Sequence, residues 1–155
     1  MKHIAILSPK WQMLEKIKKG EKTIESRWYT RKFEPWDNIK IGETIYFKET
    51  GHEVSLKTKV SAVVQIDSLG PAIVKQILVD NHMQLGINKK DIKLYYERFK
   101  SKQYCILIYL KEPQSIKPFK LNKQGLGYMS AWICFKSLKD IKVRQLTEMN
   151  LTKIA

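Results

Sequence analysis

The sequence has few cysteines and no long apolar run. Only two of its 155 residues are cysteines, Cys105 and Cys134, and each stands alone inside an apolar segment. Zinc sites and redox motifs need closely spaced cysteines, so we expect no metal site and no cofactor. Two buried free thiols in a cytoplasmic protein are the favoured interpretation. No apolar run approaches the roughly 20 residues that span a bilayer, so we expect no membrane partner.

Targeting and linker signals are also scarce. Only four consecutive apolar residues, 4–7, precede Pro9. That is too short for a signal-peptide core, and we find no lipidation motif, internal repeat or Gly/Ser linker. The length is that of one domain.

Acidic residues are scarce relative to basic ones. The chain holds 29 Lys+Arg against 15 Asp+Glu, a formal net charge of +14. The excess is greatest in residues 101–155, with 10 basic and 3 acidic side chains. At 43% hydrophobic and 10% aromatic, the chain is too rich in core-forming residues to be a disordered basic tail. A charge of this size makes polyanions, above all nucleic acid, the first candidate partners.

The hydrophobic pattern predicts an α+β domain. Strands are expected over residues 2–7, 22–28, 44–48, 54–66, 104–110 and 129–136, with a broken segment over 115–121. Helices are expected over 9–19, over 71–82, and after Asn88 as an N-cap. Alternation in 54–66 places every second residue from Val54 to Val64 on one buried face. Residues 104–110 are apolar on both faces, which predicts a central strand. Because the strands cluster in hairpins, we expect a small, mainly antiparallel β-barrel with about three helices at its ends.

The most informative segment runs from Gly20 to Arg27. On a strand, Thr23, Glu25 and Arg27 point to one side, with Glu25 and Arg27 about 7 Å apart. Lys22 is placed to reach the same opening. A carboxylate between two cations suits a ligand with a phosphate and a base amine. A surface ion pair beside a solvated lysine is the alternative that the spacing leaves open.

This segment resembles a known family. Pro9-Lys10-Trp11, a short helix and then Gly20-x-Lys22-Thr23-x-Glu25-x-Arg27 are similar to the ASCH (ASC-1 homology) family of the PUA-like superfamily. Residues 39–47, 54–66 and 129–132 also fit. The resemblance implies a PUA-like barrel over 1–136, with the basic tail 137–155 packed on it. It also implies a cleft beside the signature that binds RNA, rather than DNA, or a nucleotide.

Some members of that family are enzymes. Amidohydrolases on acylated cytidine nucleosides use a Lys and a Thr of the signature with a distant Glu. Here the Lys is Lys22, Glu25 stands in place of that Thr, and residues 82–88 contain no acid. If the protein is an enzyme, Lys22 and Glu25 are the acid/base candidates. Other members are described as ribonucleases, so a ribonuclease that uses Lys22 and Glu25 is the other enzymatic alternative. The three histidines are scattered and offer no pair for that chemistry.

Aromatic residues complete the candidate site. Trp11, at a helix start, and Tyr128, in a glycine turn, are expected to contact the ligand, because unpaired bases stack on such rings. Trp28 and Trp132 are expected in the core. Helical spacing makes Tyr95, Tyr96 and Phe99 packing residues. The predicted ligand-binding residues are therefore Lys10, Trp11, Lys22, Thr23, Glu25, Arg27 and Tyr128.

Overall fold

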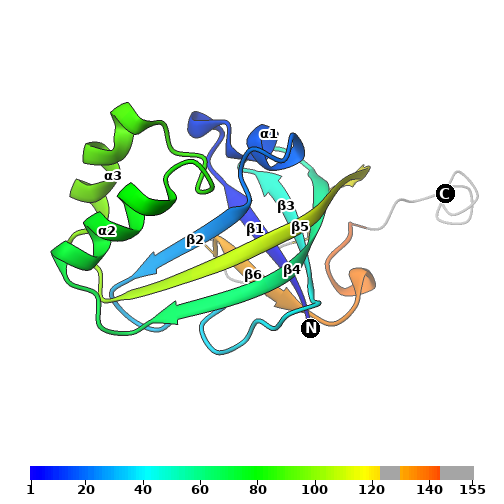
Figure 1. Ribbon diagram of the computed structural model, residues 1–155. Coiled ribbons are helices and arrows are strands. Elements are labelled where there is room, and N and C mark those ends of the chain that lie inside the picture. Colours follow the sequence, from blue (N-terminus) through cyan, green and yellow to red (C-terminus); the bar gives the residue numbers. More distant parts are fainter. Residues whose placement is uncertain (123–129, 144–155) are drawn as a thin grey trace, which may run out of the picture.

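A computed structural model describes residues 1–122 and 130–143 (Figure 1). The strands are β1 (Lys2–Leu7), β2 (Ile24–Tyr29), β3 (Thr44–Glu49), β4 (Val54–Ile66), β5 (Tyr104–Phe119) and β6 (Trp132–Phe135). The helices are α1 (Met13–Lys18), α2 (Pro71–Asn81) and α3 (Ile92–Phe99), with 3-10 turns η1 (Pro9–Trp11), η2 (Lys89–Asp91) and η3 (Leu138–Asp140). The expected α+β class is confirmed.

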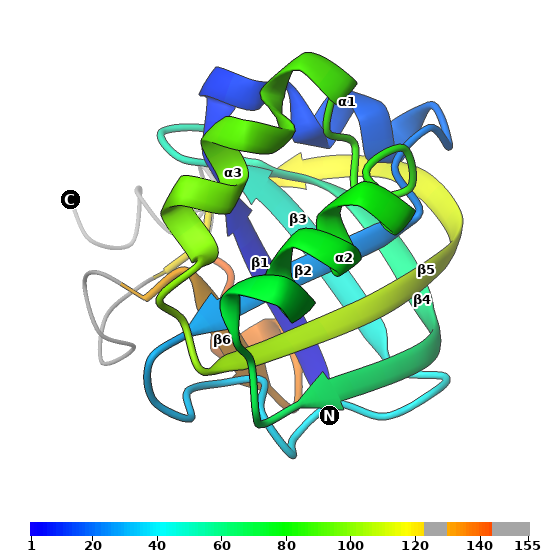
Figure 2. The ribbon, with the colours of Figure 1, turned by 60° about the vertical axis from the view of Figure 1, so that its left-hand side comes forward.

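The described strands form one curled sheet. Its order is β2-β5-β4-β3-β1-β6, and every pairing is antiparallel except that of β1 with β3. The sheet curves into a half-barrel whose two edges are β2 and β6 (Figure 2). The mainly antiparallel barrel expected from the sequence is therefore confirmed.

Strand β5 holds the two layers of the fold together. Ile106 and Ile108 enter the barrel interior, whereas Cys105 and Leu107 pack under the helices on the outer face. The prediction of a central strand is confirmed. The strand continues through the segment expected to be broken, because β4 pairs with it as far as Phe119, whereas β2 pairs with it only as far as Tyr109. Beyond that point no described strand uses its second edge, where prolines are tolerated.

Strand β4 follows the predicted alternation only in its first half. Its alternate residues from Val54 to Val60 are buried, as expected. A register shift between Val60 and Ala62 then reverses the pattern, because a β-bulge adds one residue on this strand. Val63 packs on the interior, and Val64 is 42% exposed. The prediction for Val64 was wrong.

The three helices cover the sheet at two places. α2 and α3 lie across the outer face of β2 and β5 (Figure 2), and α1 closes one end of the barrel by placing Ile17 in the interior. The helix expected over 9–19 is divided into η1 and α1. Gln12 between them has a φ of 56°, a left-handed conformation through which a right-handed helix does not continue.

The segment after β6 returns to the sheet. Ile141 is fully buried in the cluster that contains Ile4 and Tyr46, and Lys142 forms a β-bridge with Leu121. The remainder of the expected tail, 144–155, lies outside the described residues, as does the turn that contains Tyr128.

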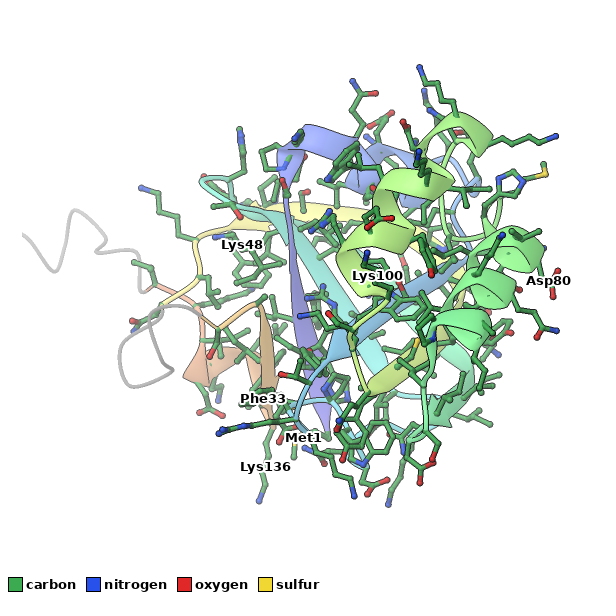
Figure 3. The ribbon with its side chains drawn as sticks, turned by 90° about the vertical axis from the view of Figure 1, so that its left-hand side faces the viewer. Met1, Phe33, Lys48, Asp80, Lys100 and Lys136 are labelled. Carbon is green, nitrogen blue, oxygen red and sulfur yellow. The ribbon has the colours of Figure 1, made fainter. Side chains whose placement is uncertain are left out.

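A buried histidine joins the N-terminus to β6. His3 Nδ1 accepts a hydrogen bond from the indole nitrogen of Trp132 at 3.1 Å, and Nε2 lies 3.0 Å from Glu43 Oε1. Indole N–H only donates, so the ring is neutral, with its proton on Nε2. The N-terminal amine of Met1 pairs with the same carboxylate at 3.1 Å. Figure 3 shows Met1 and Lys136 at this end of the barrel.

Burial lowers the pKa of His3 below its ordinary value of 6.5, although Glu43 opposes the shift. The unfolded chain therefore takes up a proton on His3 at a higher pH than the folded protein does. We predict that the free energy of unfolding falls as pH is lowered from 7 to 5. Urea denaturation of His3→Gln should show a shallower pH slope, whereas the exposed His52→Gln should keep the full slope. Equal slopes in both variants would refute this role of His3.

Candidate functional site

A cleft of about 290 Å³ runs along β2, between this edge strand, the end of β1 and α3. It is bordered by Lys22, Glu25 and Arg27 of the signature and by Trp11, Trp28, Tyr95, Arg98 and Phe99. Strand β2, a free edge of the half-barrel, passes behind α2 and α3 (Figure 2), and residues of the signature and of α3 border the same cavity.

Glu25 and Arg27 lie on the same side of β2, as their alternation predicted. Both are largely buried, with side chains 6% and 12% exposed. Glu25 Oε1 accepts a hydrogen bond from the backbone of Ser26 at 2.9 Å and lies 3.9 Å from Arg27 Nε. Glu25 Oε2 and Arg27 Nε have no hydrogen-bond partner among the described residues. Two side chains that border the cleft therefore hold a buried acceptor and a buried donor that are not satisfied.

Arg27 also spans the open side of the half-barrel. Its two terminal nitrogens lie 3.3 Å from the carbonyl oxygen of Ala131 and 3.5 Å from that of Ile6. Its guanidinium carbon lies 5.1 Å from the ring centroid of Trp132. These contacts with β1 and the start of β6 fix the guanidinium of Arg27. They explain how an arginine on an edge strand is largely buried.

Lys22 is buried beneath the cleft rather than reaching over its opening. Its ammonium donates to the carbonyl oxygens of Ile24 at 2.7 Å and Leu85 at 2.8 Å. Burial lowers the pKa of Lys22, and the nearby carboxylate of Glu25 opposes that shift. Lys22 and Glu25 do not form an ion pair with each other; each is bound to main-chain atoms.

A loop that carried no functional signal in the sequence supports Lys22. Gln84 O accepts the N–H groups of Thr23 and Ile24 at 2.9 and 3.0 Å. Gly86 O accepts Lys16 Nζ at 2.7 Å. Together with Leu85 O, three consecutive carbonyls thus dock this loop on the signature and on α1. The sequence does not reveal this loop, because the atoms that accept the hydrogen bonds are all main-chain carbonyl oxygens, which every residue has.

The structure separates the remaining predicted residues. Trp11 borders the cleft, and Lys10 lies over its ring with Nζ 5.0 Å from the centroid. Thr23 is exposed and borders a different cavity of about 30 Å³. Tyr128 lies outside the described residues.

Tyr95, Tyr96 and Phe99 of α3 pack in the core, as predicted, but the sequence interpretation missed that Tyr95 and Phe99 also border the cleft. Phe99 stacks on Trp28 with ring centroids 4.5 Å apart, and Tyr95 packs against Trp11 at 5.2 Å. Burial raises the pKa of Tyr95 to about 12, so its hydroxyl stays protonated at neutral pH. That hydroxyl has no partner among the described residues. Helical spacing showed that these residues share a face, and the same pattern is typical of a core helix.

Solved structures with this fold exist. The crystal structure of ASCH from Zymomonas mobilis matches with a TM-score of 0.59 and 17% identity, covering 99% of this chain and 92% of that chain. A point mutant of the same protein matches with the same score and identity over 95% of its length. The chain has the ASCH fold. No family model and no curated protein matches the sequence.

In this ASCH fold the cleft is electropositive. Three cationic side chains, of Lys22, Arg27 and Arg98, border it with the single carboxylate of Glu25. No described residues gather three or more His, Cys, Asp or Glu side chains that could hold a metal ion. In the described part of the chain, no helix has the length and apolarity needed to cross a bilayer. Three cationic side chains against one carboxylate suit an anionic ligand.

The loop that supports Lys22 depends on Gly86. Its φ is +75°, and a Cβ there would lie 3.0 Å from Met13 Sδ and 3.3 Å from Lys22 Cβ. We predict that Gly86→Ala lowers the free energy of unfolding by at least about 1 kcal/mol more than Gly51→Ala. Gly51 is the matched control, since its φ is +82° but nothing lies within 4 Å of the added atom. Urea denaturation measures both, and equal losses would show that the close contact is unimportant.

Proposed function

We propose that the protein binds RNA or a nucleotide and holds one unpaired base in the cleft. The observation that carries the proposal is the unsatisfied pair of Glu25 Oε2 and Arg27 Nε, in two side chains that border an aromatic-walled cavity. Leaving a buried polar group without a partner costs about 1–3 kcal/mol. A ligand that supplies a donor and an acceptor recovers part of that cost on binding.

The chemistry of the pair selects among bases. A carboxylate only accepts and a guanidinium only donates, so the ligand needs a donor beside an acceptor. The exocyclic amine and adjacent ring nitrogen of cytosine or adenine meet this need. In the orientation that places the cytosine amine on Glu25, uracil presents a carbonyl oxygen to the same carboxylate, and both groups are acceptors. In that orientation the pair favours cytosine over uracil.

The walls and the charges of the cleft support the same class of ligand. Trp11, Tyr95 and Phe99 offer ring surface, and stacking of a base on an aromatic ring contributes about 1–3 kcal/mol. Arg98, which is exposed, provides a forked donor for phosphate. RNA is preferred over DNA because the ASCH resemblance of the signature implies that role, and because proteins read RNA mainly through unpaired bases.

A hydrolase that uses Lys22 and Glu25 is the second reading of the signature. The Lys22 ammonium is held by two carbonyl oxygens, and the Glu25 carboxylate by the Ser26 backbone. Neither arrangement places a proton acceptor beside a nucleophile, which acid/base catalysis needs. The geometry supports recognition of a base better than its hydrolysis.

Affinity for mononucleotides tests the proposal. We expect CMP to bind, and Arg27→Leu to weaken that binding at least about tenfold, because the variant loses the charge-assisted donors of the cleft. The matched control is Arg31→Leu, an exposed arginine outside the cleft. Isothermal titration calorimetry measures both, after urea denaturation has shown that the variants fold. Equal CMP affinity in the wild type and Arg27→Leu, or no binding of any nucleotide by the wild type, would overturn the proposal.

Discrimination between CMP and UMP tests the role of Glu25. These ligands have the same ring size, and we expect a preference for CMP of roughly 5- to 150-fold, the range that 1–3 kcal/mol gives. In Glu25→Gln the amide adds a donor, so the preference should shrink or reverse while UMP still binds. If Glu25→Gln left the preference for CMP over UMP unchanged, the carboxylate of Glu25 would have no role in base recognition.

A further inference from the structure

A second hollow adjoins the cleft at the start of α3. Its volume is about 220 Å³, and it shares Trp11, Ile87 and Tyr95 with the cleft. Its other walls come from η1, α1 and the loop that enters η2, which meet at one end of the barrel (Figure 2). We propose that this hollow is a second nucleotide subsite, so that the protein binds two consecutive nucleotides of a single strand. This inference rests on the proposed function of the cleft.

The shared wall is aromatic on both cavities. The rings of Trp11 and Tyr95 lie 5.2 Å apart at an angle of 50°, and both border the cleft and the hollow. Tyr95 is 6% exposed, and its hydroxyl has no partner among the described residues. Tyr95 borders both cavities, so its hydroxyl is a polar group without a partner at their shared wall. Consecutive bases stack on such platforms with little dependence on sequence.

The polar groups of the hollow are not engaged in capping the helix. Asn88 was expected as an N-cap, and it occupies that position before η2, but its side chain makes no capping hydrogen bond. The side chain of Asp91 makes none at the start of α3. Asn88 therefore occupies the predicted N-cap position, but the prediction that its side chain caps the helix was wrong. An amide and a carboxylate that both border the hollow can instead read the edge of a base.

Cations lie where a linking phosphate would pass. Lys10 is exposed and its Nζ lies 5.0 Å from the ring centroid of Trp11, at the wall that the two cavities share. Lys16 also borders the hollow, and its hydrogen bond to Gly86 O uses one of the three donors of an ammonium. Two lysines against Asp91 leave the hollow positive. The phosphodiester between two consecutive nucleotides would lie against these lysines. A free nucleoside has no phosphate and would make no such contact.

The test compares CMP with the dinucleotide CpC by isothermal titration calorimetry. We expect CpC to bind the wild type at least about tenfold more tightly than CMP, because a second base gains its own stacking surface. Asn88→Phe fills the hollow, and Asn88→Ala removes its amide without adding bulk. In Asn88→Phe the tenfold gain should disappear while CMP affinity stays unchanged, and in Asn88→Ala the gain should shrink. Lys89→Phe, the exposed neighbour that borders neither cavity, is the control and should keep the gain.

Two results would overturn the second subsite alone. One is CpC binding no tighter than CMP while CMP binding still depends on Arg27. The other is a full CpC gain in both folded variants of Asn88, which would place the second nucleotide elsewhere. If neither CMP nor CpC binds the wild type, the proposed function fails and the second subsite fails with it.

Discussion

Main-chain carbonyls that need donors determine the geometry of this protein's candidate site. The oxygens of Gln84, Leu85 and Gly86 point to the signature and to α1, and they receive backbone N–H groups and the ammonium groups of Lys22 and Lys16. Buried carbonyls without donors are unfavourable, so the loop and the two lysines position each other. The result is one wall that borders both the cleft and the second hollow.

The opposite wall depends on the charge of Arg27. A sheet that curls without closing leaves two free edges, and Arg27 bridges them through the carbonyl of Ala131 and the ring of Trp132. The guanidinium is thereby kept near Glu25 at 3.9 Å without completing a hydrogen bond to it. A site that is held open in this way has its donors and acceptors in place before the ligand arrives, which reduces the cost of ordering them on binding.

Local patterns predicted some parts of this arrangement and not others. The two apolar faces of residues 104–110 led to a central strand, and alternation placed Glu25 beside Arg27, because both depend on a period of two residues. Alternation failed at Val64, where a bulge shifts the register, and the first helix is divided at Gln12. The packing around them determines where a bulge and a left-handed residue occur, so the neighbouring residues in the sequence do not predict them.

The sequence by itself determined the class of fold, the positive charge and the residues that alternate along β2. It also indicated a polyanionic partner, since net charge is a sum over residues and needs no coordinates. Only the tertiary structure decided that Tyr95 borders the cleft, that Thr23 does not, and that Lys22 is tied to a loop 63 residues away in the chain. These are relations between segments distant in sequence. Helical spacing or strand alternation says which side chains share a face, but not which other face they meet.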